Sequence, residues 1–178
     1  ALEVVVIDDG SRDATLAVAR AAFGGDGRVT ILTQRNGGKA SALAAGVRAT
    51  RAEIVVVIDA DTVLAKDAIA LLARHFTDPA VGAVSGNVHV GNAATLMGRW
   101  QRLEYICQHH LERLAGDAVN GISVVPGAVG AWRRSAVEAA GGFTGDTLAE
   151  DCDMTLKLLR DGWRVRYEAA ADAFTEAP

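Results

Sequence analysis

Two short acidic motifs, each placed directly after an apolar run, are the residues of this sequence most able to do chemistry. Asp59 and Asp61 end the run IVVVIDAD, and Asp8 and Asp9 end the run VVVIDD. In an extended segment, residues i and i+2 point the same way, so Asp59 and Asp61 are expected to converge. Two carboxylates that close repel each other unless a cation or hydrogen-bond donors lie between them. Mg²⁺ or Mn²⁺ suits such oxygen ligands; a polar strand end, with Asp61 capping the next segment, is the simpler interpretation.

The second acidic motif and the glycine-rich segment that follows it could bind a nucleotide. Asp8 or Asp9 could accept hydrogens from a nucleobase or a ribose, although a plain turn also explains the letters DDGS. The segment RNGGKASALAAG has glycines with free backbone N–H groups, the positive charge of Lys39, and a helix that begins directly afterwards. These features favour an anion site. The spacing matches neither a Walker loop nor GxGxxG, and a glycine turn with a solvated lysine is the alternative.

Two later segments could take part in proton transfer or in binding a ligand. In TLAEDCDMT, Glu150, Asp151 and Asp153 crowd the start of a helix, where the helix dipole tolerates acids. A carboxylate held there could also act as a general base, which contributes roughly 10²–10⁴ in rate. In VVPGAVGAWRR, Gly127 would let a bulky ligand approach the backbone, and a plain turn is the alternative. The two arginines that end this segment either lie on a solvated face, or one of them binds a phosphate.

The chemistry-bearing residues are positioned by alternating strands and helices. Apolar runs predict strands at residues 4–7, 29–33, 54–58, 81–90 and 163–168, and periodic segments predict helices at residues 12–23, capped by Ser11, and 95–115. Over the first ninety residues this order predicts a three-layer α/β/α sandwich with a mostly parallel central sheet. Ligands of such sheets bind at the carboxyl ends of the strands, where both aspartate motifs fall.

Length and composition set limits on the class of protein. The chain has 178 residues, of which 50% are hydrophobic, and a net charge of −4. This suits one domain over residues 1–178 with a real core and argues against a nucleic-acid partner. No apolar run reaches the ~20 residues of a membrane-spanning helix. Because the sequence begins within a strand, we expect it to be a piece of a longer protein.

The order of the motifs DDGS, NGGK, DAD, PGA with RR, and TLAED resembles the family 2 glycosyltransferases, over nearly the whole chain. The segments SGNVHVGN, RWQRLEYI and VVPGAVGAWRRSAVEAAGGF are most similar to the poly-N-acetylglucosamine branch of the processive membrane synthases, which also make chitin, hyaluronan and cellulose. The resemblance implies a GT-A fold, a Rossmann-like domain that binds a nucleotide sugar. It also implies that a first strand and a C-terminal Gln/Arg/Trp motif lie outside this chain.

For the donor side, the resemblance implies specific roles for five residues. Asp8 and Asp9 match the carboxylates that hold the uridine, with Asp9 slightly favoured. Lys39 matches the lysine near the diphosphate. Asp59 matches the aspartate that faces the sugar nucleotide, and Asp61 matches the one that holds the divalent metal, Mg²⁺ or Mn²⁺.

For the acceptor side, the resemblance implies that Gly127 belongs to the acceptor motif. Asp151 matches the catalytic base, with Glu150 in support. The implied reaction is a single inverting displacement in which a hydroxyl of a polysaccharide or oligosaccharide attacks the anomeric carbon of a UDP-sugar. The enzyme would be a hexosyltransferase of polysaccharide biosynthesis. Its catalytic domain would lie on the cytoplasmic face of the cell membrane, within a membrane-embedded parent protein.

Two alternatives to a glycosyltransferase remain. A nucleotidyltransferase of related fold would use similar acidic metal ligands, but it would need a glycine-rich loop with arginine near the amino terminus. A non-catalytic module that binds a nucleotide sugar would keep the fold without the reaction. The complete acidic set argues against that module, because carboxylates that repel one another are readily lost when they have no function.

Overall fold

The computed structural model describes residues 2–90 and 110–175. The chain forms two compact units. The first unit combines Ala1–Ala52 with Gly142–Glu150, and the second combines Glu53–Gly141 with Asp151–Pro178. Most of the helix expected at residues 95–115 lies outside the described residues. Among the residues that are described, no helix is both long and apolar enough to cross a membrane.

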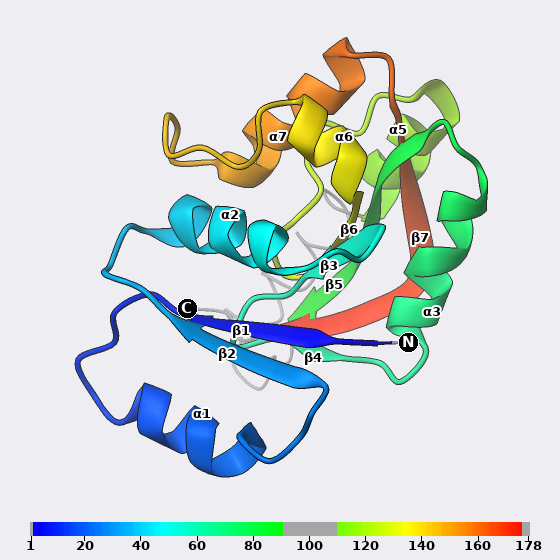
Figure 1. The fold of residues 1–178 in the computed structure, drawn as a ribbon. Helices are drawn as coiled ribbons and strands as arrows, with labels where there is room; N and C mark the ends of the chain where they lie inside the picture. The colour runs from blue at the N-terminus through cyan, green and yellow to red at the C-terminus, as the bar shows by residue number, and fades with distance from the viewer. Residues whose placement is uncertain (1, 91–109, 176–178) are drawn as a thin grey trace, which may run out of the picture. The chain divides into compact units, whose positions relative to one another are not determined.

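The first unit is built from two strand–helix pairs, seen in blue and cyan in Figure 1. Strands β1 and β2 pair in parallel, from Val4 opposite Val29 to Asp8 opposite Thr33. A parallel pair needs a crossover between its strands, and α1 supplies it. The bounds are β1 (Val4–Asp8), α1 (Thr15–Phe23), β2 (Val29–Thr33) and α2 (Lys39–Ala49). The carboxyl ends of both strands therefore meet at the glycine segment before α2.

The start of α1 differs from the sequence prediction. The helix begins at Thr15 rather than at residue 12, and Ser11 does not cap it. Asp13 lies just before the helix, and its Oδ1 accepts hydrogen bonds from the Thr15 amide (3.0 Å) and the Thr15 hydroxyl (2.6 Å). The Ser11 amide instead donates to Asp8 Oδ1 at 3.3 Å. Ser11 is thus part of the DDGS turn and not of the helix.

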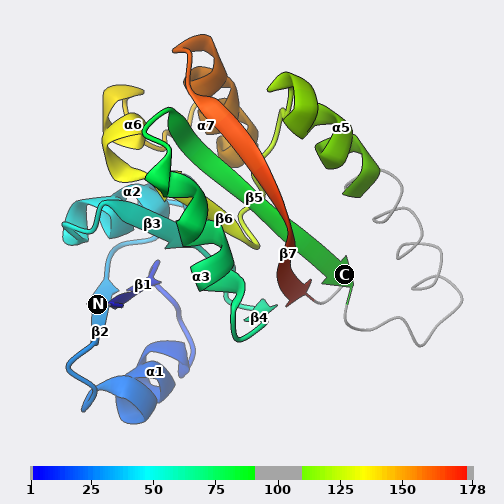
Figure 2. The same cartoon turned by 90° about the vertical axis from the view of Figure 1, so that its right-hand side faces the viewer.

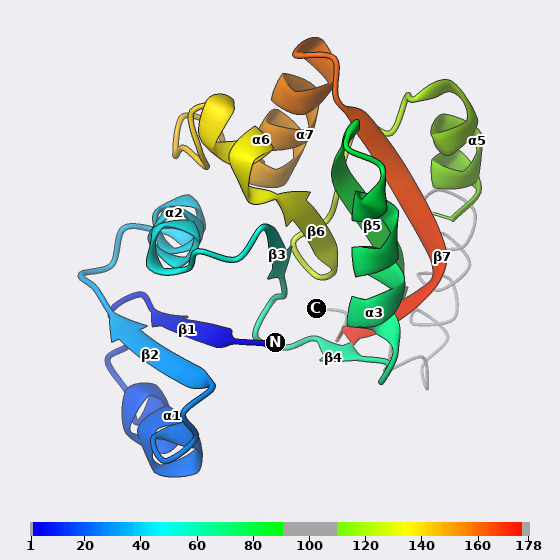
Figure 3. The same cartoon turned by 45° about the vertical axis from the view of Figure 1, so that its right-hand side comes forward.

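The second unit contains a five-stranded sheet in the order β3-β6-β5-β7-β4, which can be followed in Figure 3. Only the β5–β7 pair is parallel, and the other three pairs are antiparallel. The expectation of a mostly parallel sheet is therefore wrong for this unit, because β6 lies between β3 and β5 and runs against both. The strands are β3 (Ile54–Val57), β4 (Val63–Leu64), β5 (Val81–Val90), β6 (Gly130–Arg133) and β7 (Arg164–Thr175).

The core of the second unit lies between the sheet and α3 with the 3₁₀-helix η1. Leu72 and Phe76 pack there with Val84 and Val88, which alternate along β5 toward this side. Figure 2 shows α3 and α5 on opposite sides of the β5–β7 pair. The helical elements are α3 (Ala68–Ala73), η1 (Arg74–Thr77), α5 (Glu112–Val119), α6 (Arg134–Ala139) and α7 (Glu150–Arg160).

Strand β7 is longer than the sequence predicted, because it continues past a bulge. The register runs from Ser85 opposite Tyr167 to Asn87 opposite Asp172, so residues 168–171 oppose Gly86 alone. A Cβ on Gly86 would lie 2.7 Å from Val129 Cγ2 and 2.9 Å from the Ala171 oxygen. Only glycine permits this close approach. The bulge lets a second stretch of β7 pair with the carboxyl end of β5.

Candidate active site

Asp9 fastens the glycine segment of the first unit. Its Oδ1 accepts hydrogen bonds from Gln34 Nε2 (2.7 Å) and the Gly37 amide (3.0 Å), and its Oδ2 accepts one from the Gly38 amide (2.8 Å). The Gln34 hydrogen bond, followed by those from Gly37 and Gly38, lowers the pKa of Asp9 below its ordinary value. The glycine N–H groups expected to face a phosphate therefore bind the Asp9 carboxylate in this conformation.

Asp8 is turned away from solvent. It is 7% exposed, and its Oδ2 accepts a hydrogen bond from the Thr33 hydroxyl at 3.0 Å. Hydrogen bonding from Ser11 is the largest cause that lowers the pKa of Asp8, and Thr33 adds to it. Asp8 thus joins the carboxyl ends of β1 and β2, while the half-buried Asp9 lies nearer to solvent. This difference agrees with the slight preference for Asp9 as the uridine ligand, which stays a prediction.

Lys39 connects the glycine segment to the acidic start of α7. Lys39 is the first residue of α2 and follows Gly38, whose φ of 82° is suited to glycine. Its Nζ lies 3.4 Å from Glu150 Oε1, and the Glu150 side chain is 10% exposed. A carboxylate so far removed from solvent needs a nearby cation, which Lys39 provides. Glu150 is therefore placed with the donor-side residues of the first unit.

The DAD segment forms a turn and not an extended strand end. Strand β3 ends at Val57, and the Thr62 amide donates to the Asp59 carbonyl at 3.0 Å. The premise that Asp59 and Asp61 point the same way because the chain is extended is therefore wrong. Asp59 is half-buried and Asp61 is exposed. The nearest recorded polar contact of the Asp61 carboxylate is the Thr62 hydroxyl, at 3.4 Å.

The donor atoms around the DAD turn fit a divalent ion that a substrate completes. No group of three or more His, Cys, Asp or Glu side chains that could hold a metal occurs among the described residues. A structural metal site would need such a group, whereas Mg²⁺ bound to nucleotide phosphates needs only one or two carboxylates. The exposed Asp61 and the neighbouring Asp59 supply that number.

In the second unit, Asp151 is linked to the segment that contains Gly127. The Thr155 hydroxyl donates to the Asp151 carbonyl (2.7 Å) and accepts from the Val125 amide (3.0 Å). Thr155 is fully buried, and Val125 is two residues before the buried Gly127. The Asp151 carboxylate accepts a hydrogen bond from the Cys152 amide at 2.8 Å. The structure thus brings the expected base and the expected acceptor segment to one side of α7.

Arg133 is not available to a phosphate. It is 7% exposed, and its guanidinium donates to the carbonyls of Val81 (2.9 Å), Phe76 (2.9 Å) and Asp78 (3.0 Å). The remaining nitrogen lies 2.7 Å from Glu53 Oε1. Arg133 therefore joins β6, η1 and β5. The neighbouring arginine at position 134 pairs with Glu138 on α6.

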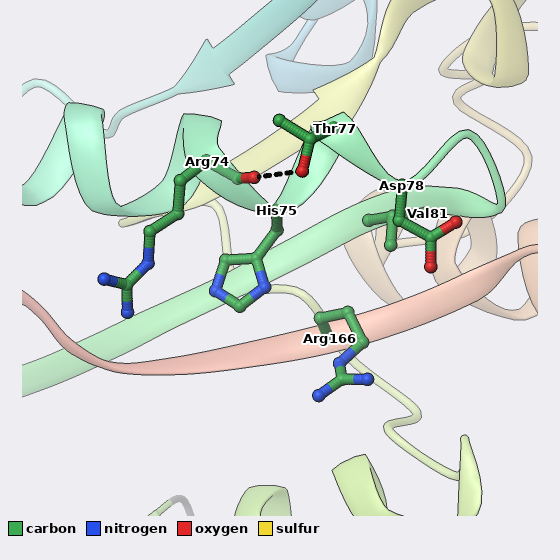
Figure 4. Close-up of a pocket in the computed structure, with 6 residues that line it drawn as sticks. All are labelled: Arg74, His75, Thr77, Asp78, Val81 and Arg166. Carbon is green, nitrogen blue, oxygen red and sulfur yellow. Dashed lines mark hydrogen bonds between the residues drawn. The ribbon is translucent and has the colours of Figure 1, made fainter.

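A cavity of about 270 Å³ opens at the amino ends of β5 and β7 and contains none of the expected site residues. Figure 4 shows its lining, with the Thr77 hydroxyl bonded to the Arg74 carbonyl. The basic side chains that line it contact acidic ones. Glu168 accepts hydrogen bonds from Arg74 and His75, and Arg166 lies 2.8 Å from Asp117. Ligands of α/β sheets bind at the carboxyl ends of strands, so we do not place the active site here.

The eight expected site residues fall into two groups. Asp8, Asp9, Lys39 and Glu150 belong to the first unit, and Asp59, Asp61, Gly127 and Asp151 to the second. That both groups surround one pocket stays a prediction. Sequence reasoning missed Gln34 and Thr155. Thr155 could have been found, because it follows Asp151 by one helical turn, but nothing in the sequence indicates the bond from Gln34 to Asp9.

Comparison with known proteins identifies the family. The model of the family described as glycosyltransferase like family 2 matches residues 1–178. Poly-beta-1,6-N-acetyl-D-glucosamine synthase of Staphylococcus aureus is 33% identical over 181 residues, which cover 99% of this chain and 43% of that protein. The enzyme of the same name from Staphylococcus epidermidis is 32% identical over 95% of this chain and 41% of that protein.

A solved structure also resembles the chain. It is the mannosyltransferase PcManGT from Pyrobaculum calidifontis in complex with GDP-Man and Mn²⁺, with a TM-score of 0.82 and 29% identity over 99% of this chain and 48% of that one. This likeness confirms the expected GT-A type of α/β fold. The chain spans less than half the length of each of these relatives. From the family match along its whole length, the chain belongs to the family 2 glycosyltransferases.

Proposed function

We propose that this chain is the catalytic part of a hexosyltransferase that moves N-acetylglucosamine from UDP-N-acetylglucosamine to a hydroxyl of a growing polysaccharide. The observation that carries the proposal is the 33% identity to poly-beta-1,6-N-acetyl-D-glucosamine synthases across 99% of the chain. The acidic residues that glycosyl transfer needs are all present, and the base candidate and the acceptor segment are joined through Thr155.

The reaction would be one displacement at the anomeric carbon. The acceptor hydroxyl forms the new C–O bond, the bond from the anomeric carbon to the diphosphate oxygen breaks, and the configuration inverts. Asp151 takes the hydroxyl proton, which a carboxylate can do only within hydrogen-bond reach of that oxygen. UDP leaves with the electron pair of the broken bond.

The other residues would bind and orient the donor. Asp9 and Asp8 hold the uridine side, and the charge of Lys39 lies near the diphosphate. Asp59 faces the sugar nucleotide, and Asp61 would hold Mg²⁺ or Mn²⁺, which offsets the charge of the departing diphosphate. The supporting observation is that PcManGT was solved with GDP-Man and Mn²⁺. Gly127 would give the acceptor close access to the backbone.

The location of the reaction follows from the same proposal. We place the catalytic domain on the cytoplasmic face of the cell membrane and within a membrane-embedded protein. The resemblance to processive synthases supports this placement. Protease protection of the domain in sealed, right-side-out membrane vesicles, and its digestion in inverted vesicles, is the expected result.

Binding of UDP to the full-length protein, measured by calorimetry with and without Mn²⁺, tests the proposal. Binding is expected to need Mn²⁺ and to be lost in Asp61→Asn. Asp67→Asn is the matched control, because Asp67 is also an exposed aspartate and its side chain caps no helix. UDP binding that does not depend on the metal in the unaltered protein would contradict the metal role. No UDP binding under either condition would contradict the proposed function.

A further inference from the structure

Four side chains at the carboxyl ends of β5 and β7 share one face of the sheet. Along β5, Val88 packs into the core, while Asn87 and His89 alternate to the other face. Along β7, Ala173 packs into the same core, while Asp172 and Phe174 alternate away from it. The four residues on this face are called the strand-end cluster.

The register of the sheet places these side chains in two adjacent rows. Asn87 lies opposite Asp172, and His89 lies opposite Phe174. On the next strand, Val63 of β4 also lies opposite Phe174, so His89, Phe174 and Val63 form one row across three strands. Figure 2 shows the ends of β5 and β7 beside each other. Directly opposite residues point to the same face, so the row is continuous.

The polar atoms of the strand-end cluster fix the His89 ring. His89 Nε2 lies 2.7 Å from Asp172 Oδ1, and Asn87 Nδ2 donates to the same oxygen at 3.0 Å. A carboxylate oxygen only accepts hydrogen bonds, so the bond to Asp172 needs the proton on Nε2. Asn87 Nδ2 also lies 3.0 Å from Nε2, and in that tautomer it donates to Asp172 Oδ1 and to the Ala169 carbonyl instead. The His89 ring stacks on Phe174, with centroids 5.3 Å apart and planes at 24°. The ring is therefore held by a hydrogen bond on one side and by an aromatic contact on the other.

The exposed side chains and the polar atoms without a hydrogen bond in the strand-end cluster are of the kinds that bind a sugar. Phe174 is 45% exposed and Val63 is 68% exposed, so the row presents two adjacent apolar side chains to a ligand. Beside them, Asp172 Oδ2, His89 Nδ1 and Asn87 Oδ1 take part in no recorded hydrogen bond within the described parts of the chain. A pyranose ring has an apolar C–H face and a rim of hydroxyl donors, and it would match both features.

The position of the cluster relates it to the donor site. Val63 is two residues after Asp61, which the proposed function assigns to the metal and the diphosphate. In a nucleotide sugar the pyranose is joined to the diphosphate, and in the transition state the acceptor sugar contacts the same carbon. A saccharide subsite beside the DAD turn is therefore where the reaction needs one.

We propose that Asn87, His89, Asp172 and Phe174, with Val63 beside them, form a pyranose-binding subsite of the transfer reaction. Phe174 and Val63 would contact the C–H face of the ring, and the open acceptor atoms would receive its hydroxyl hydrogens. The inference rests on the proposed function. It names a shared ligand chemistry, a hexopyranose, which belongs to either the donor or the terminal sugar of the acceptor.

Kinetics of the full-length protein test the subsite. In Phe174→Ala and Asp172→Ala, the KM for one saccharide is expected to rise roughly tenfold, the effect of removing a central contact, while the Kd for UDP stays unchanged. Phe174→Trp, which keeps an aromatic surface, should retain most of the affinity. Phe23→Ala is the matched control, since Phe23 is 51% exposed at the end of α1.

Two arms identify the sugar. A raised KM for UDP-N-acetylglucosamine in the hydrolysis reaction without acceptor assigns the subsite to the donor hexose, and a raised KM for β-linked N-acetylglucosamine oligosaccharides assigns it to the acceptor. Unchanged values of both KM, or an equal loss of UDP affinity, overturn the subsite. Thermal unfolding of each variant shows whether a loss is only one of stability, which also overturns it. If the unaltered protein neither binds UDP nor transfers sugar, the proposed function fails instead.

Discussion

In the first unit the glycine segment is held by hydrogen bonds, whereas the centre of the second unit is held by packed apolar side chains. Helix α1 buries none of its residues, and the glycine segment is fastened by Asp9 and Gln34. In the second unit, Leu72 and Val84 are fully buried between α3 and the sheet. Changes at polar groups should therefore act locally in the first unit, while changes in the core of the second should alter its stability.

The largest expected effect is on the reaction itself. Asp151→Asn removes the proposed base but keeps the shape of the side chain, so kcat should fall by roughly 10²–10⁴. The melting temperature should change little. Release of UDP from UDP-N-acetylglucosamine in the presence of acceptor is the measurement. Asp153→Asn is the control, because Asp153 pairs with Lys157 on the same helix; an equal loss of rate in both variants would remove Asp151 from its role.

The next effect is on the stability of the second unit. Leu72→Ala leaves a cavity against β5 and should destabilise the unit by about 2–5 kcal/mol. Leu156→Ala, at a leucine of α7 that is 50% exposed, should change stability by less than about 0.5 kcal/mol. Urea unfolding with a probe in each unit measures both. If Leu72→Ala lowered the free energy of unfolding of the first unit by the same amount, the two units would not differ in how they are stabilised.

A third change tests the polar link inside this apolar unit. Thr155→Val keeps the shape of the side chain but leaves the buried Val125 amide without its acceptor, which costs about 1–3 kcal/mol. Thr155→Ser keeps the hydroxyl and should restore most of that stability. If the link positions Asp151 relative to the Gly127 segment, kcat falls in the valine variant and recovers in the serine variant. If kcat does not fall in the valine variant and recover in the serine variant, the role of Thr155 is limited to packing.

These cases show which parts of the molecule the sequence could predict. Apolar runs located β1, β2, β3 and β5, because a strand that is buried in a sheet needs apolar residues in its local sequence. The antiparallel insertion of β6 could not be predicted, since strand pairing depends on contacts between distant segments. The same limit applies to the site. The acidic motifs could be recognised in the sequence. The hydrogen bonds that the glycine amides donate to Asp9 could not, because they depend on a turn and on Gln34.

The smallest effect is on pH dependence in the first unit. The pKa values of Asp8 and Asp9 are lowered by their hydrogen bonds, so these carboxylates stabilise the folded state above the ordinary aspartate pKa of about 3.9. That stability is lost as the pH falls through the lowered folded-state values. NMR titration of the Gly37 and Gly38 amides should show a transition below that of a free aspartate, absent in Asp9→Asn. A transition at or above the ordinary value would contradict the Asp9 contacts.

Arg133 joins three elements at one corner of the second unit. Its guanidinium is buried where β6 meets η1 and the start of β5, with a ring contact to Phe76 at 5.5 Å. The planar guanidinium has five N–H donors, so it reaches three carbonyls and Glu53 at once, whereas the compact ammonium of a lysine could not. Replacing Arg133 by lysine would therefore leave buried carbonyls without a donor although the positive charge is kept. At this corner the shape of the cation matters more than its charge.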